Sequence, residues 1–209
     1  MTELFPFFII GNPRSGTTLL RLLLTSHSKL EVPPESSFIV WLYSKYFNFK
    51  YSLKNLTSFV DDLHASRKFE YWGVERKKLL EYLQNRRPNN YAGLISGVYL
   101  YYAEMKGKEI VKWGDKNNYY LYHVDKLTEL FPGAIFIHII RDGRDVACSY
   151  REIMKKEIKS RYAPKLPVDL PDIAREWTGN IKAVEASFSK IEPGNTISVR
   201  YEDLVREPE

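Results

Sequence analysis

The sequence predicts an α/β domain in which helices cover a central, mostly parallel sheet. Its strongest buried-strand pattern is the run AIFIHII at residues 134–140. Strand-like segments alternate with helical ones along the chain, an order typical of parallel strands joined by right-handed crossovers. The 209 residues suit a single domain spanning 1–209, and a composition of 44% hydrophobic and 27% charged residues is that of a globular protein.

The first strand and helix are predicted at the N-terminus. The apolar run at residues 5–10 ends at Gly11, a short loop follows, and Thr17 begins a leucine-rich helical segment that should end near His27. Glycines at both ends of the loop, Gly11 and Gly16, would let backbone N–H groups approach a ligand closely. The N-terminus of a helix also favours negative charge. We therefore expect an anion-binding loop here.

The spacing of the two loop glycines matches that of a P-loop, but the residues after the second glycine differ. Thr17 and Thr18 stand where a P-loop carries Lys and Ser or Thr. Arg14, inside the loop, is the expected replacement cation, because its guanidinium suits a tetrahedral oxyanion. The sequence thus predicts a P-loop-like domain with a different reaction.

The segment after the first helix places a carboxylate near this loop. The prolines of LEVPPE, residues 30–35, should interrupt regular structure and fix Glu35 just before an aromatic helix at residues 36–47. Glu35 could then lie beside the anion site, or it could only cap the helix that follows it.

Residues 48–108 are predicted to form a helical insertion or cap. Helical patterns cover residues 53–63, 76–83 and 91–105, and the insertion contains no strand pattern. Aromatic residues here could line a substrate pocket or fill the core.

The C-terminal half supplies the remaining strands and helices. The expected strands are residues 109–113, 134–140 and 196–201, and the expected helices include 146–159 and 172–191. Ligands of open α/β sheets bind at the carboxyl ends of the strands. Arg14 and Arg141 at two such ends suggest a ligand with two separated anions.

Several of these residues have simpler explanations. Lys116 could be a solvent-exposed loop lysine, and Arg141 could belong to an ion-paired loop whose carboxylates cap the next helix. Ser149 could be a packing residue in a helix. His138, inside the apolar strand, is expected to be a core histidine with its hydrogen bonds satisfied.

Composition excludes several classes of protein. The net charge of +5 is modest, and no nucleic-acid-binding motif is present. The histidines show no metal-ligand spacing, so no metal site is expected. One cysteine, Cys148, forbids an internal disulfide and fits a reducing compartment. Without a signal peptide or membrane span, a cytoplasmic protein is expected.

Two motifs carry a resemblance to a known family. PRSGTT at residues 13–18 and RDGRDVACSY at residues 141–150 resemble the two nucleotide-binding motifs of sulfotransferases that use 3′-phosphoadenosine 5′-phosphosulfate. WGDKNNYY, LFPGAIFIHIIRDGRD and VRYEDLVREP also resemble that family, particularly its bacterial members. The placing of Glu35 is similar to that in tyrosylprotein sulfotransferases. The resemblance covers most of the chain except the helical middle.

The resemblance implies a role for each matching residue. Glu35 would be the general base, and Lys116 would stabilise the leaving group or the transferring sulfuryl oxygens. Tyr201 would contact the cosubstrate, whose product is 3′,5′-adenosine bisphosphate. Arg141 and Ser149 would hold the 3′-phosphate. The 5′-phosphosulfate would be held by the first loop, namely Arg14, Ser15, Gly16, Thr17 and Thr18.

The expected function is transfer of a sulfuryl group to a hydroxyl, or an amine, of an acceptor that the sequence does not identify. A sulfuryl group is less anionic than a phosphoryl group, so Mg²⁺ is not needed. The alternatives are a nucleotide or small-molecule kinase and a non-catalytic nucleotide-binding module. Family members continue to a glycine- and lysine-bearing loop over the cosubstrate, and we expect that loop to be missing from a chain ending at Glu209.

Overall fold

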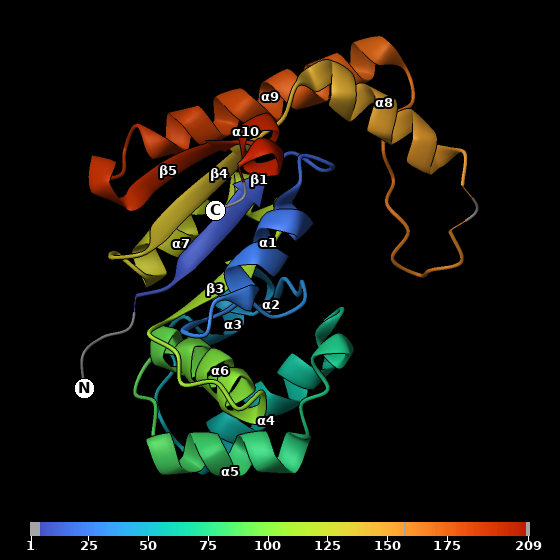
Figure 1. The fold of residues 1–209 in the computed structure, drawn as a ribbon. Helices are drawn as coiled ribbons and strands as arrows, with labels where there is room; N and C mark the ends of the chain where they lie inside the picture. The colour runs from blue at the N-terminus through green and yellow to red at the C-terminus, as the bar shows by residue number, and fades with distance from the viewer. Residues whose placement is uncertain (1–4, 157, 208–209) are drawn as a thin grey trace.

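The computed structural model describes residues 5–156 and 158–207, and it is built on one sheet of five parallel strands (Figure 1). The spatial order is β2-β3-β1-β4-β5, and every neighbouring pair is parallel. All strands therefore end at the same edge of the sheet. Their bounds are β1 Phe7–Gly11, β2 Leu30–Glu31, β3 Lys112–Lys116, β4 Ile135–Ile140 and β5 Thr196–Arg200.

The central strand β1 is buried on both faces, which is why its sequence is apolar throughout. Phe8 pairs in register with Asp115 of β3 and Phe136 of β4. Alternate residues of β1 face opposite layers. Phe7 and Ile9 join a smaller core on one side, whereas Phe8 joins the main core on the other.

The helices form a layer on each face of the sheet. Leu20 of α1 and Leu204 of α10 pack on the smaller core, and Leu127 of α7 and Val184 of α9 pack on the main one. The bounds in this part of the chain are α1 Thr17–Ser26, η2 Asn118–Tyr122, α7 Val124–Leu130, α8 Gly143–Met154, α9 Leu170–Phe188, η3 Pro193–Asn195 and α10 Tyr201–Arg206. This arrangement confirms the predicted α/β fold with a parallel sheet.

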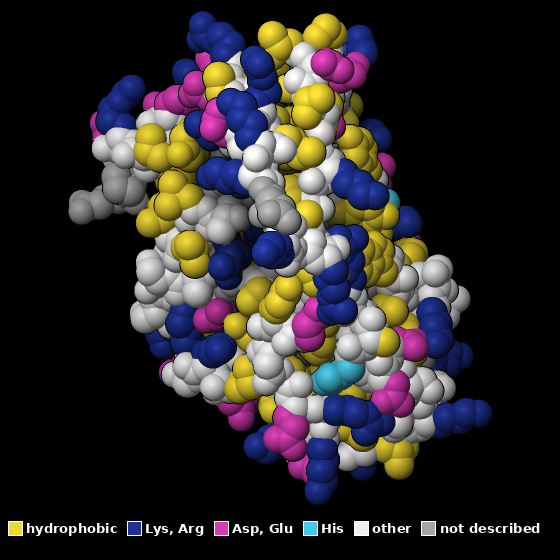
Figure 2. All heavy atoms as spheres, turned by 90° about the vertical axis from the view of Figure 1, so that its right-hand side faces the viewer, with side chains coloured by type: hydrophobic (Ala, Val, Ile, Leu, Met, Phe, Trp, Pro, Cys, Tyr) yellow, Lys and Arg dark blue, Asp and Glu magenta, His cyan; other side chains and the backbone are white. Residues whose placement is uncertain are grey.

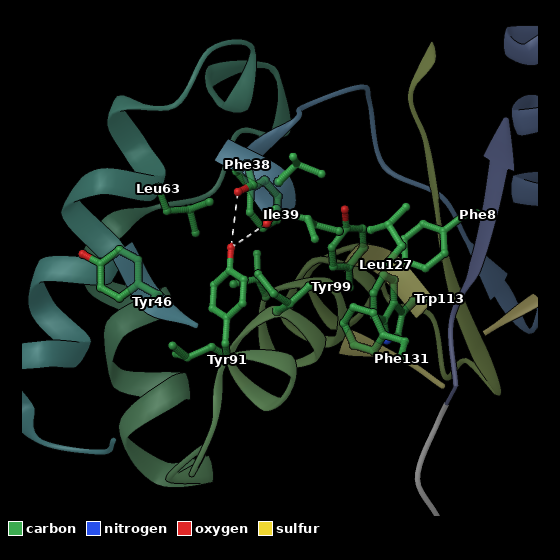
Figure 3. Close-up of a cluster of buried hydrophobic side chains, with 14 of the residues drawn as sticks. Phe8, Phe38, Ile39, Tyr46, Leu63, Tyr91, Tyr99, Trp113, Leu127 and Phe131 are labelled. Atoms are coloured by element: carbon green, nitrogen blue, oxygen red, sulfur yellow. Dashed lines mark hydrogen bonds between the residues drawn. The ribbon is translucent and has the colours of Figure 1, made fainter. Parts of the chain in front are cut away.

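The helical middle is held to the sheet by buried aromatic side chains (Figure 3). The rings of Tyr99 and Trp113 stack with centroids 4.0 Å apart, and the Tyr91 hydroxyl donates to the carbonyl of Ile39 at 2.9 Å. These aromatics fill the core and do not line a pocket. Between β2 and β3 the chain forms α2 Phe38–Trp41, α3 Tyr43–Tyr46, α4 Leu53–Ala65, η1 Phe69–Trp72, α5 Arg76–Arg86 and α6 Tyr91–Met105.

The strand expected at residues 109–113 was placed too early. It is β3, at Lys112–Lys116, so Gly114, Asp115 and Lys116 lie inside the strand. A Cβ atom on Gly114 would come within 2.3 Å of the Phe7 ring, so glycine here permits close strand packing and does not mark a turn.

Three other boundaries were also wrong. The helix expected at residues 36–47 is divided into α2 and α3, and Leu30–Glu31, where no regular structure was expected, forms the short edge strand β2. The helix expected at 146–159 is α8, which begins at Gly143 because the Asp142 side chain accepts from the N–H of Arg144 at 2.8 Å and caps it.

Candidate active site

Eight of the residues singled out in the sequence line one cavity at the carboxyl edge of the sheet, among them Gly16, Thr17 and Thr18 of the first loop. The cavity has a volume of about 340 Å³, and its walls include Arg14, Glu35, Lys116, Arg141 and Tyr201. This is the position at which open α/β sheets bind ligands. Lys and Arg side chains gather across the middle of the face that carries the loop after β1 (Figure 2).

The loop after β1 is tightly turned. The N–H of Ser15 donates to the carbonyl of Asn12 at 3.1 Å, and Arg14 and Gly16 have φ angles of 69° and 91°. At Gly16 the left-handed backbone and the surroundings both require glycine, because an added Cβ would lie 2.3 Å from the ring of Tyr201.

The N-terminus of α1 has free capacity for an anion. Its N-cap, Gly16, offers no capping side chain, and its first turn carries no acidic residue. The first backbone N–H groups of a helix have no partner within it, and the helix dipole is positive there. Ser15 is fully buried, and its hydroxyl oxygen makes no hydrogen bond to the residues that the structure describes. An oxyanion at this position would accept hydrogen bonds from the N–H groups at the start of α1 and from the Ser15 hydroxyl.

Arg14 and Arg141 converge on the same cavity. Nε of Arg14 donates to Oγ of Ser149 at 3.1 Å, and Nη1 of Arg141 donates to the carbonyl of Arg14 at 3.2 Å. The Arg141 guanidinium lies 4.5 Å from the centre of the Tyr201 ring. Both arginines follow strand ends and line the first cavity, in which the Arg141 side chain contacts the backbone of the loop that carries Arg14.

The ion pair of the loop after β4 forms between Arg144 and Asp142, and not at Arg141 as the alternative explanation supposed. Arg144 pairs with Asp142 at 2.6 Å and its side chain is 90% exposed, whereas Arg141 reaches Asp145 only at 4.0 Å. The carboxylate of Asp142 caps α8, as that alternative supposed. Arg141 remains directed into the cavity.

Glu35 lies between two lysines. Its Oε2 is 3.0 Å from Nζ of Lys116, and its Oε1 is 3.3 Å from Nζ of Lys68. Burial raises the pKa of Glu35, but the two lysines lower it by more, so the pKa lies below its ordinary value and the group is a carboxylate at neutral pH. Glu35 does not cap a helix, and Lys116, at 5% exposure, is not a solvent-exposed loop lysine.

Two buried titratable groups lie on the strands that flank β1. The carboxylate of Asp115 accepts a hydrogen bond from the Tyr120 hydroxyl. Burial raises the pKa of Asp115 to about 7. His138 is buried as expected, but its Nε2 makes no hydrogen bond to a described residue, so its hydrogen bonds are not all satisfied. Burial lowers the pKa of His138 to about 4, so it is neutral at pH 7.

A second cavity of about 420 Å³ adjoins the first. Both are lined by Glu35 and Asn118, so the carboxylate of Glu35 stands between them. Three exposed aromatic side chains, Trp41, Tyr119 and Tyr122, line the second cavity. The second cavity thus combines aromatic rings with the cationic side chains of Arg67, Lys68 and Lys165.

A chain of hydrogen bonds joins the second cavity to the loop. Tyr122 donates to the side chain of Asn180, which donates to the side chain of Asn12 at 2.6 Å. Asn12 in turn donates to the Tyr150 hydroxyl at 3.0 Å. The buried Asn12 therefore fixes the start of the loop to α8 and α9.

The sequence did not single out Lys68, Asn12 or Asn118. Asn118 accepts a hydrogen bond from Thr17 at 3.3 Å and stands two residues after Lys116 in the run WGDKNNYY, which could have indicated it. Asn12 could have been suspected from its place directly after a buried strand. Lys68 lies in the helical middle, where the sequence carries no signal for it.

Metal-binding clusters and membrane-spanning helices are both absent from the described residues. Within residues 5–156 and 158–207, no cluster of three or more His, Cys, Asp or Glu side chains is placed to bind a metal. Over the same residues, no helix is both long enough and apolar enough to cross a bilayer.

Comparison with known proteins gives consistent matches. The model of the sulfotransferase family matches residues 6–209. Protein-tyrosine sulfotransferase A of Caenorhabditis elegans is 26% identical over 98% of this chain and 47% of its own length. The omega-hydroxy-beta-dihydromenaquinone-9 sulfotransferase Stf3 of Mycobacterium tuberculosis is 24% identical over 98% of this chain and 60% of its own. The chain therefore spans about half the length of these relatives.

Solved structures show the same fold. The sulfotransferase domain from the curacin biosynthetic pathway superimposes with a TM-score of 0.60 at 22% identity, covering 99% of this chain and 71% of its own. A sulfotransferase from Alicyclobacillus acidocaldarius gives a TM-score of 0.52 at 13% identity, covering 99% of this chain and 77% of its own.

Proposed function

Because this chain belongs to the sulfotransferase family, we propose that it transfers a sulfuryl group from 3′-phosphoadenosine 5′-phosphosulfate to a hydroxyl, or an amine, of an acceptor. The observation that carries the proposal is the joint placing of Arg14, Glu35, Lys116 and Arg141 around one cavity. A base and three cations meet there at the end of the sheet, beside an uncapped helix N-terminus.

The first loop would hold the phosphosulfate end of the donor. The N–H groups at the start of α1, the hydroxyls of Ser15, Thr17 and Thr18, and the Arg14 guanidinium supply donors for its oxygens. The backbone freedom of Gly16 allows this approach. The buried Ser15 hydroxyl, which lacks a partner among the described residues, supports the fit of an oxyanion here.

Arg141 and Ser149 would hold the 3′-phosphate, and the Tyr201 ring would support the Arg141 guanidinium. Arg14, whose Nε donates to Ser149, would turn to the sulfuryl end when the donor binds. This places the two phosphate groups of the product, 3′,5′-adenosine bisphosphate, at neighbouring parts of one cavity.

Glu35 would act as the general base. The acceptor enters from the second cavity and gives its proton to Glu35 as its oxygen forms a bond to sulfur and the bond from sulfur to the leaving phosphate breaks. Lys116 stabilises the charge that gathers on the leaving oxygen, the position at which a fixed cation is most effective in a loose transition state. No metal is required for this step, and the single cysteine fits a cytoplasmic setting.

The test combines binding and transfer. Calorimetry should show that the chain binds 3′,5′-adenosine bisphosphate more tightly than ATP with Mg²⁺, and sulfur-labelled donor mixed with a metabolite extract should yield labelled products. Arg14→Ala should abolish most of the labelling, with Arg144→Ala as the matched exposed control. Tighter binding of ATP with Mg²⁺ would favour a kinase, and bisphosphate binding without any transfer would favour a non-catalytic module.

A further inference from the structure

Lys68 is the second ammonium group on Glu35, and it comes from a different part of the fold from the first. Lys68 lies in the turn between α4 and η1, whereas Lys116 lies in β3. Lys68 faces Oε1 at 3.3 Å, and Lys116 faces Oε2 at 3.0 Å. An acceptor hydroxyl that approaches Glu35 therefore meets an oxygen that already faces an ammonium group.

The two lysines differ in their freedom to move away. The side chain of Lys116 is 6% exposed and that of Lys68 is 25% exposed. Lys116 lines the first cavity, whereas Lys68 lines the second, the side from which an acceptor would reach Glu35. Lys68 is therefore the group that an incoming acceptor meets.

The backbone of Lys68 is held in a conformation that a lysine adopts only with difficulty. Its φ angle is 68°, in the left-handed region that favours glycine. The Lys68 N–H donates to the hydroxyl of Tyr162 at 3.3 Å, and the Ser36 hydroxyl donates to the carbonyl of Arg67 at 3.1 Å. Strain of this kind persists only where the surroundings enforce it, and it concentrates at functional sites.

We propose that Lys68 is a positioning residue for Glu35. The Lys68 ammonium group holds Oε1 of Glu35 until an acceptor enters the second cavity, and Oε1 then accepts a hydrogen bond from the acceptor hydroxyl. The inference rests on the proposed function. The proton of the hydroxyl passes to Oε1 as the oxygen attacks sulfur, and it leaves later to solvent. Lys68 remains in the wall of the second cavity.

The charges around Glu35 fix the expected pH effect. Lys116 and Lys68 face its carboxylate directly, and Arg14 and Arg141 line the first cavity with it. Asp115 precedes Lys116 within β3, and the other charged residues that line the second cavity are Arg67, Lys165 and Glu176. Burial raises the pKa of Glu35, and both lysines lower it. Removal of Lys68 should therefore raise the pKa of Glu35 while Lys116 still opposes the effect of burial.

Two substitutions separate the role of the ammonium group from that of the backbone. Lys68→Met removes the charge and keeps the strain, whereas Lys68→Gly removes the charge and relieves the strain. We expect the titration midpoint of the Glu35 carboxyl carbon to rise in both, measured by carbon NMR on the full chain and assigned with Glu35→Gln. The Tm of Lys68→Gly should equal or exceed that of the wild type. The matched control is Lys78→Met, which removes an exposed pair with Glu75 on α5 and should leave the Glu35 midpoint unchanged.

Activity provides the second readout. In Lys68→Met and Lys68→Gly, the acid limb of the pH profile of kcat/KM should move to higher pH by the same amount as the midpoint of the Glu35 carboxyl. In Lys68→Arg the limb should return to its wild-type position. An unchanged midpoint in both variants would overturn the pairing, and an unmoved acid limb beside a raised midpoint would overturn the positioning role. Absence of transfer by the wild type would count against the proposed function, and the titration would still decide the pairing.

Discussion

The loop after β1 and the helical middle meet at Glu35, but they contribute to the site in different ways. The loop supplies consecutive residues whose backbone and side chains face one cavity. The middle supplies isolated side chains, such as Trp41 and Lys68, from separate elements. The first cavity is therefore formed largely by one continuous motif, whereas the second depends on side chains that packing brings together from separate elements. Substitutions in the two regions should differ accordingly.

The largest effect is expected where the two regions meet. Glu35→Gln keeps the size of the side chain but removes its charge and basicity, so turnover should fall by about 10²- to 10⁴-fold. Affinity for 3′,5′-adenosine bisphosphate should change little, because the donor groups lie on the loop side. Turnover is measured with labelled donor and affinity by calorimetry. Unchanged turnover would assign the base to another residue.

The next prediction compares two glycines with left-handed backbones, Gly16 in the loop after β1 and Gly73 in the helical middle. Gly16→Ala adds a Cβ within 2.3 Å of Tyr201 at φ 91°, whereas Gly73→Ala in the middle meets nothing within 4 Å at φ 63°. Gly73→Ala should lower the free energy of unfolding by about 1 kcal/mol, because alanine is strained in a left-handed backbone. Gly16→Ala should lower the free energy of unfolding by the same backbone contribution and by about 1–3 kcal/mol more, because the added Cβ overpacks the site. Chemical denaturation measures both, and equal losses would contradict the close packing of the loop.

A smaller effect is expected at the 3′-phosphate side. Arg141→Ala removes a charged donor from the first cavity, so the Kd for the bisphosphate should rise by about 10- to 100-fold, the equivalent of about 1.5–3 kcal/mol. Arg144→Ala, three residues away and exposed, is the control, and its Kd should stay near that of the wild type. Equal losses in the two variants would indicate that only overall charge matters.

The last prediction concerns pH and the buried Asp115 of β3. Its folded-state pKa, about 7, is raised above the unfolded value of about 3.9, so its contribution to stability is greatest at low pH and falls as pH rises through this window. His138 acts in the opposite direction, because its lowered pKa costs stability as pH falls below about 6.5. Urea unfolding between pH 4.5 and 7.5 should show that Asp115→Asn gains stability relative to wild type as pH rises. A difference that does not vary with pH would refute the raised pKa.

Much of the loop side could be predicted from the sequence because its chemistry is local. Gly16, Thr17 and the buried strand before them share one short stretch, and Arg141 follows the strongest strand in the chain. The carboxyl ends of parallel strands meet by geometry, which brought the two arginines to one cavity. Their close approach was not predictable, because it depends on the Arg141 side chain turning back toward the loop.

The acceptor side could not be predicted in the same way. Lys68 reaches Glu35 only because the turn after α4 is held against Tyr162 from a loop 94 residues further along the chain. The buried state of Lys116 depends on Gly114 and Phe7, which allow β3 to continue through residues that read as a turn. Long-range packing of this kind leaves no periodic pattern in the sequence.

The exposed Cys148 on α8 has a practical consequence. It is the sole cysteine of the 209 residues and the immediate neighbour of Ser149, whose hydroxyl faces Arg14. A thiol-reactive fluorophore would therefore attach at one known position without any engineering, in the wall of a separate cavity between α8 and α9. A change in its emission on addition of 3′,5′-adenosine bisphosphate would give an optical titration.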